Sequence, residues 1–114
     1  MSLERGRYYA ILGALVVRER KRKKLTQAAL AEKIDVSQSF VARIEAGKLS
    51  VDTYLFGQTA KNLFECNHAE LDRRIHEING QYFAAEAAVS PKRIPSRDAE
   101  RALIDYVVAV FQLC

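Results

Sequence analysis

Tryptophan is absent from this 114-residue chain, and proline and cysteine each occur only twice. With two prolines and five glycines there is little material for long loops, and no internal repeat is visible. Cys66 and Cys114 form no C-x-x-C pair and have no histidine at metal-ligand spacing, which argues against a zinc site. Two lone thiols in a chain with 49% hydrophobic residues suit a reducing compartment, where no disulfide is needed.

Long hydrophobic runs are also missing. The stretch 8–17 is largely apolar, but it is far shorter than the ~20 residues that a membrane-spanning helix requires. A dense basic cluster follows it in place of a small-residue cleavage site, which argues against a secretory signal. The sequence therefore predicts a buried helix here, and a cytoplasmic protein with no membrane partner.

Positive charge is concentrated in the first part of the chain. Residues 1–66 carry twelve Lys and Arg against seven Asp and Glu, whereas residues 67–114 carry six against seven. Six of the basic residues fall within 18–24. This imbalance indicates an anionic partner for the first part, although a charge run by itself is as often a solvated helix face.

The hydrophobic pattern is helical throughout, so we expect an all-α fold. Thr26 and Ser37 are good N-caps, and Gly47 ends the helix that Ser37 opens. Asn67 and Glu70 resemble a capping box for a later helix. The predicted helices span about 4–23, 26–33, 38–46, 50 or 52 to 64, 67–79 before Gly80, and 97–113. The alanine-rich segment 81–89 is compatible with further helix, and 90–95, which holds both prolines, is a predicted connection.

The first predicted helix is apolar on more than one side. Leu12, Leu15 and Val16 share one face, while other apolar residues lie elsewhere around the helix. Such a helix needs a second surface to pack against.

The two short helices 25–33 and 38–46, joined by a three-residue turn, have the spacing of a helix-turn-helix. The stretch LTQAALAEKIDVSQSFVARIEAGK resembles the repressor-type helix-turn-helix of phage repressors and of small bacterial regulators related to the Xre repressor. Matching elements are Thr26-Gln27, Leu30-Ala31, Val36-Ser37-Gln38, Val41, Ile44-Glu45 and Gly47-Lys48. The resemblance implies a compact five-helix DNA-binding domain over 1–66, with an additional C-terminal helical segment over 67–114.

The outward face of helix 38–46 is the predicted base-contacting surface. Gln38 offers the donor and acceptor for a bidentate pair with adenine, and Arg43 offers the fork that matches guanine. Ser39 suits either base, and Ala42 suits a thymine methyl group. Phosphate contacts are expected from Gln27, Ser37, Lys48, Thr53, Tyr54, Arg18, Arg22 and Lys24.

Arg20 and Glu45 match a family pair that forms a partly buried ion bridge between the first helix and the recognition helix. Two independent surface charges are the alternative. If the bridge exists, removal of one partner leaves the other charge buried and unpaired.

The last predicted helix is too apolar all round for the surface of a monomer. It either folds back on the first helix or pairs with a second subunit, as two-fold dimers on palindromic DNA do. We expect both, with homodimer contacts from Leu103, Val107, Val110 and Phe111.

No nucleophile–base pair, glycine-rich phosphate loop or metal-ligand set is visible, and His68 and His76 lack further ligands nearby, so we expect no enzyme, cofactor or metal. The sequence favours a transcriptional regulator, with repression as its expected mode, that binds double-stranded DNA and joins the nucleoid when bound. The alternatives are an antitoxin whose C-terminal segment holds a toxin and an adaptor that contacts only proteins.

Overall fold

The structure is a computed structural model that describes the backbone of residues 5–48, 50–89 and 97–112, and the side chains of 6–48, 50–85 and 100–110. Six helices make up this part of the chain, and no strand occurs in it, so the all-α prediction is confirmed. The helices are α1 (Arg5–Arg22), α2 (Gln27–Ile34), α3 (Gln38–Glu45), α4 (Thr53–Asn62), α5 (His68–Val89) and α6 (Arg97–Gln112). The predicted connection at 90–95 lies outside the described residues.

Short polar side chains begin four of these helices, because each accepts a backbone N–H that has no partner within the helix. The Oγ1 atom of Thr26 accepts from Ala29 N at 3.0 Å, and the Oγ atom of Ser37 accepts from Phe40 N at 3.2 Å. Asp52, rather than Ser50, caps α4. Asn67 accepts from Glu70 N before α5. Local capping therefore determines the residue at which each of these four helices begins.

Helix α5 takes the longer of the two courses that the sequence left open. It continues past the predicted end at Asn79, through Gly80 to Val89, so the alanine-rich segment 81–89 is further helix. Glycine inside a helix costs only about 1 kcal/mol relative to alanine, and the side chains on either side of it offset that cost, because Ile78 and Tyr82 are fully buried. Tertiary packing thus overrides the local signal to stop.

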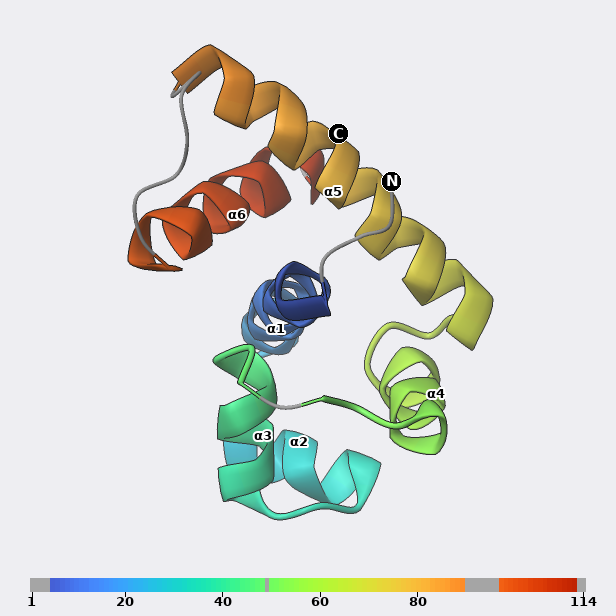
Figure 1. Cartoon of the computed structure of the whole chain (residues 1–114). Coiled ribbons are helices and arrows are strands. Elements are labelled where there is room, and N and C mark those ends of the chain that lie inside the picture. Colours follow the sequence, from blue (N-terminus) through green and yellow to red (C-terminus); the bar gives the residue numbers. More distant parts are fainter. Residues whose placement is uncertain (1–4, 49, 90–96, 113–114) are drawn as a thin grey trace.

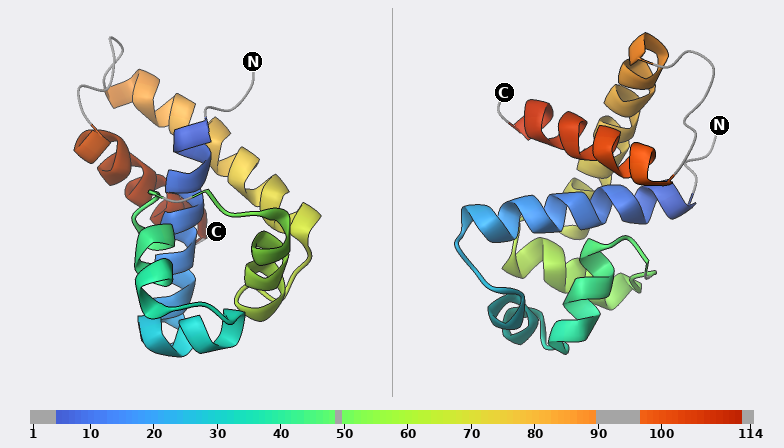
Figure 2. Two further views of the ribbon diagram at one scale, coloured as in Figure 1. Left: turned by 60° about the horizontal axis from the view of Figure 1, so that its bottom comes forward. Right: turned by 90° about the vertical axis from the view of Figure 1, so that its left-hand side faces the viewer.

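Helix α1 lies at the centre of the molecule, with α2, α3 and α4 on one side and α5 and α6 on the other (Figures 1 and 2). It packs against α3, α5 and α6, which supplies the second surface that its apolar pattern requires. One core cluster includes residues from both predicted domains, among them Leu15, Ile75 and Ile104. The C-terminal helices are therefore part of the same core as the N-terminal ones.

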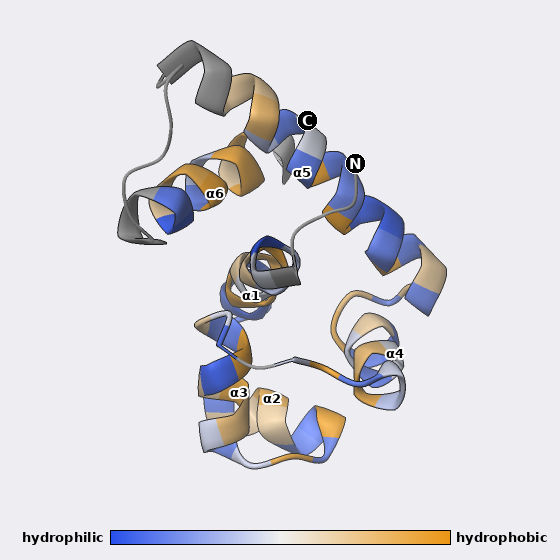
Figure 3. Cartoon of the chain, in the orientation of Figure 1, coloured by the Kyte–Doolittle hydropathy of each residue, from blue (hydrophilic) through white to orange (hydrophobic). Residues whose placement is uncertain are grey.

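Hydrophobic residues recur along α6 (Figure 3), and the structure assigns several of them to this core. Ile104, Val107 and Val108 are buried against α1 and α5. We expected Val107 to face a second subunit, so its burial within the single chain corrects that expectation. Leu103 is half-buried and packs on the core, and Val110 is exposed. The side chain of Phe111 lies outside the described residues.

Candidate nucleic-acid interface

Helices α2 and α3 form a rigid two-helix unit. The chain turns between them because Asp35 adopts a left-handed conformation, with φ of 59°, and Val36 N donates to Ala31 O at 3.0 Å. The two helices pack together through buried apolar residues, which are Leu30, Ala31, Ile34, Val41 and Ile44. The crossing of α2 and α3 is therefore determined by apolar contacts and by one tight turn.

Gly13 brings α1 unusually close to the end of α3. A Cβ atom at this position would lie 2.6 Å from the carbonyl oxygens of both Ile44 and Glu45. Gly47, with φ of +72°, ends the turn after α3 and lies against the backbone of Ala10. Only a residue without a side chain fits at Gly13, so α1 supports α3 directly through backbone contact.

An ion pair ties the same two helices together. The Nε and Nη2 atoms of Arg20 donate to the two carboxylate oxygens of Glu45, at 2.6 and 3.1 Å. Exposed fractions of 13% and 6% for the two side chains make this a largely buried pair. Arg20 also donates to Leu25 O, and Gln27 donates to Glu45 at 2.9 Å. The carboxylate thus joins α1, α2 and α3, and Gln27 braces α3 through it.

The opposite side of α3 faces outward. Gln38, Ser39 and Arg43 are exposed, and Ala42 is half-buried. Val41, Ile44 and Glu45 on the inward side are buried. A helix held firmly from behind therefore presents an amide, a hydroxyl and a guanidinium to the surroundings.

The predicted phosphate contacts differ in how well the structure supports them. Lys24 and Lys48 are exposed. Thr53 and Tyr54 open α4 as expected, and the ring of Tyr54 is 74% exposed. However, the carboxylate of Asp52 caps this helix and accepts from Leu55 N at 2.7 Å. A negative charge at this helix start opposes the binding of a phosphate there.

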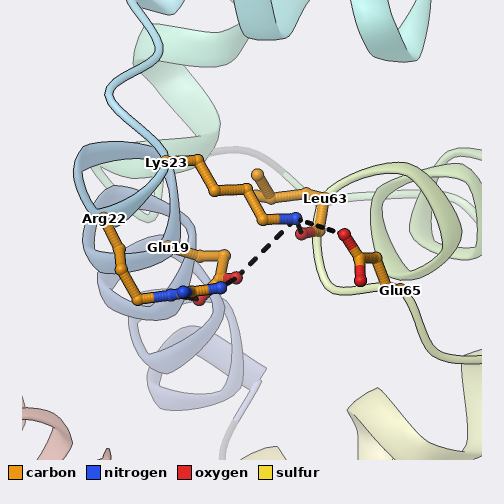
Figure 4. Close-up of polar contacts among 5 residues, drawn as sticks. All are labelled: Glu19, Arg22, Lys23, Leu63 and Glu65. Carbon is orange, nitrogen blue, oxygen red and sulfur yellow. Dashed lines mark hydrogen bonds and ion pairs between the residues drawn. The ribbon is translucent and has the colours of Figure 1, made fainter.

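Several cations of the basic cluster interact with other parts of the chain (Figure 4). Arg22 pairs with Glu19, and its hydrogen bonds hold the pKa of that carboxyl below the usual value. Lys23 donates to Leu63 O at the end of α4 and forms an ion pair with Glu65 at 3.2 Å. This clamp between α1 and α4 was not predicted from the sequence, because no local pattern indicates that Leu63 O and Glu65 lie beside Lys23.

Arg18 and Arg22 line a groove between α1 and α6, together with Lys21. Figure 2 (right) shows α6 on the side of α1 opposite to α2 and α3. Both side chains border this groove, and the phosphate contacts expected of Arg18 and Arg22 stay a prediction.

The geometry of α2 and α3 agrees with a comparison to known families. A family model described as Helix-turn-helix matches residues 17–55. This segment is a helix-turn-helix of the repressor type. It runs from the second half of α1 through α2 and α3 to the start of α4, which includes the Arg20–Glu45 pair and the whole outward face of α3. No curated protein and no solved structure shows significant similarity to the chain.

Other chemistry has little support in the described part of the chain. The residues there include no group of three or more His, Cys, Asp and Glu that suits a metal ion. The ring of His68 lies against Phe56, with centroids 4.5 Å apart, and His76 lies edge-on to Tyr8. Partial burial raises the pKa of the Cys66 thiol, which makes it a weaker nucleophile. None of the described helices is long and apolar enough to cross a membrane.

Proposed function

We propose that the chain is a sequence-specific DNA-binding regulator that inserts α3 into a major groove. The observation that carries this proposal is the arrangement of α3. Its exposed residues are hydrogen-bonding side chains, while its buried residues and the Arg20–Glu45 pair anchor it to α1 and α2. In a helix-turn-helix, the second helix reads base edges from such a position.

Gln38, Ser39, Ala42 and Arg43 are the proposed base-contacting residues. A glutamine amide pairs with adenine through one donor and one acceptor, and an arginine pairs with guanine through two donors. Each well-formed bidentate pair contributes about 1–3 kcal/mol of discrimination. Both Gln38 and Arg43 are exposed, so neither has to leave a buried site in order to reach a base.

Phosphate contacts are proposed from the residues around this face. Ser37 begins α3 with a neutral cap, so the positive end of the helix dipole is not cancelled there. Lys24 and Lys48 supply charge from the turns before α2 and after α3. Gln27 contributes mainly by bracing Glu45, and Thr53 and Tyr54 contribute less because Asp52 lies beside them.

The proposal includes a homodimer that binds a palindromic site and represses by occluding a promoter. Support comes from α6, where Tyr106 is 62% exposed and Val110 is 47% exposed. Large apolar side chains at neighbouring turns of one helix are typical of a protein interface. Val107 is buried and therefore does not belong to the proposed dimer surface on α6. Leu103 and Val110 lie at the edge of that surface.

Selection of binding sites from a random DNA pool tests the proposal. Purified protein is used at about 150 mM salt, because non-specific attraction to phosphates weakens as salt rises. The expected result is a palindrome whose half-sites lie about one helical turn apart. Recovery of no sequence would contradict specific recognition, and recovery of a single unrepeated site would contradict the dimer.

Arg43→Ala then identifies the base-reading role within the selected site. We expect it to lose about 1–3 kcal/mol of preference for one base pair, while affinity for unrelated DNA changes little. Lys61→Ala is the matched control, because it removes one exposed cation from the far end of α4. If Arg43→Ala weakens binding to all sequences equally, Arg43 contacts phosphate and the assignment is wrong.

A further inference from the structure

The groove between α1 and α6 is a concave surface that the proposed DNA contacts do not use. It has a volume of about 460 Å³, which falls within the range of ordinary small-molecule sites. Its apolar lining comes from Ala14 and Val17 of α1 and from Val108 of α6. The groove is open, and α6, which forms one of its walls, lies on the side of α1 opposite to α2 and α3 (Figure 2).

Three cations and one carboxylate surround this apolar lining. Arg18, Lys21 and Arg22 come from successive turns of α1, and Asp105 comes from α6. Asp105 pairs with Arg101 at 3.1 Å, and Arg22 pairs with Glu19. Among the residues that the structure describes, Arg18 and Lys21 have no hydrogen bond or ion pair to a side chain. The groove therefore carries an excess of positive charge that the protein leaves uncompensated.

We propose that this groove binds a small organic acid, a carboxylate attached to an apolar body. The apolar body lies over Val17, which is half-buried, and the carboxylate reaches Arg18 and Lys21 at the edge. Arginine favours a carboxylate because its planar fork matches the two oxygens, and lysine adds a compact charge. This inference concerns the α1–α6 side of the molecule alone and does not depend on DNA binding.

A bare anion does not explain the groove equally well. Cations along one solvent-exposed helix face attract sulfate or phosphate anywhere along that face, with little dependence on the neighbouring surface. Here the cations border a concave surface made by two helices, and Val108 is 2% exposed at its base. Cations beside a concave apolar surface predict that tight binding requires a ligand with both a negative charge and an apolar body.

The test is an NMR titration of the full ¹⁵N-labelled chain with 2-naphthoate at about 150 mM salt. We expect saturable shifts in amides of residues 14–22 and 101–108. The neutral analogue 2-naphthalenemethanol and sodium sulfate are each expected to bind at least about tenfold more weakly, because each lacks one half of the recognised chemistry. Equal binding of either compound would overturn the proposal, as would the absence of saturable shifts with 2-naphthoate.

Charge variants locate the site. The double variant Arg18→Gln/Lys21→Gln is expected to weaken 2-naphthoate binding about tenfold or more, since hydrogen bonds between a cation and a carboxylate are roughly twice as strong as neutral ones. Lys33→Gln/Lys61→Gln removes two exposed cations elsewhere and is expected to leave the affinity unchanged. Far-ultraviolet circular dichroism of both variants establishes that the helices are retained. If the two double variants bind equally well, the ligand site is not this groove.

Discussion

The two sides of α1 differ in how they hold their neighbours. Toward α3, a glycine allows backbone contact, and a largely buried ion pair joins Arg20 to Glu45. Toward α6, apolar side chains form the contact beside an open groove, and one half-buried pair, Arg7–Glu100 at 3.2 Å, spans the helix ends. One side therefore holds α3 in a fixed position through backbone contact and a buried ion pair, while the other side keeps an accessible surface.

Glu45→Ala is expected to have the largest effect. It leaves the Arg20 guanidinium in a largely buried position without its carboxylate, which typically lowers the free energy of unfolding by about 3–5 kcal/mol. Urea denaturation measures the loss. Arg22→Ala removes a pair whose arginine is exposed and serves as the control, with an expected loss of at most about 1 kcal/mol. Similar losses in both variants would show that the pair toward α3 is not special.

Ile104→Ala tests the opposite side of α1. Ile104 is fully buried, so the substitution is expected to lower the free energy of unfolding by about 2–5 kcal/mol in a single transition. Val110→Ala changes an exposed side chain of the same helix and is expected to cost much less. A separate early transition, seen by circular dichroism during urea denaturation, would mean that α6 unfolds independently of the rest.

Gly13→Ala tests the backbone contact itself. Its Cβ atom would collide with two carbonyl oxygens of α3, so one helix must shift, at an expected cost of about 1–3 kcal/mol in unfolding free energy. In Gly80→Ala the new Cβ meets nothing within 4 Å, and we expect a gain of about 0.5–1 kcal/mol. Thermal unfolding of the two variants should therefore move in opposite directions, and a gain for Gly13→Ala would refute the close contact.

Glu19→Gln is expected to have the smallest effect, and it depends on pH. The hydrogen bonds from Arg22 lower the pKa of Glu19 in the folded state. The resulting stabilisation is therefore present above the ordinary glutamate pKa of about 4.3 and is lost as the pH falls through the lower folded value. Stability measured from pH 6 to pH 3 should fall less steeply for Glu19→Gln than for the unaltered chain. An exposed carboxylate variant, Glu32→Gln, is the control, and identical acid profiles for both variants would contradict this account.

The helix-turn-helix was predictable from local signals. Thr26 and Ser37 cap helices, Gly47 takes a positive φ, and the apolar spacing of Val41 and Ile44 marks the buried face. These features act within a few residues, so the sequence alone indicates them. The Arg20–Glu45 pair was inferred only because the segment resembles a family that contains it.

Long-range packing was not predictable in the same way. Helix α5 passes through Gly80 because Ile78 and Tyr82 are buried by helices far away in the sequence. The burial of Val107 and the clamp between Lys23 and Leu63 likewise depend on which elements meet in space. Six similar cations in one run have different roles for this reason.

The most direct test of the account is an amide-resolved NMR titration of the chain with its selected DNA site at about 150 mM salt. The strongest shifts are expected in residues 37–43 of the recognition helix and its cap, with smaller shifts at 24, 27 and 48. Amides of residues 101–108, which lie on the other side of α1, should change little. Strongest shifts along the α1–α6 groove would contradict the central claim, because DNA would then bind the opposite side of the molecule.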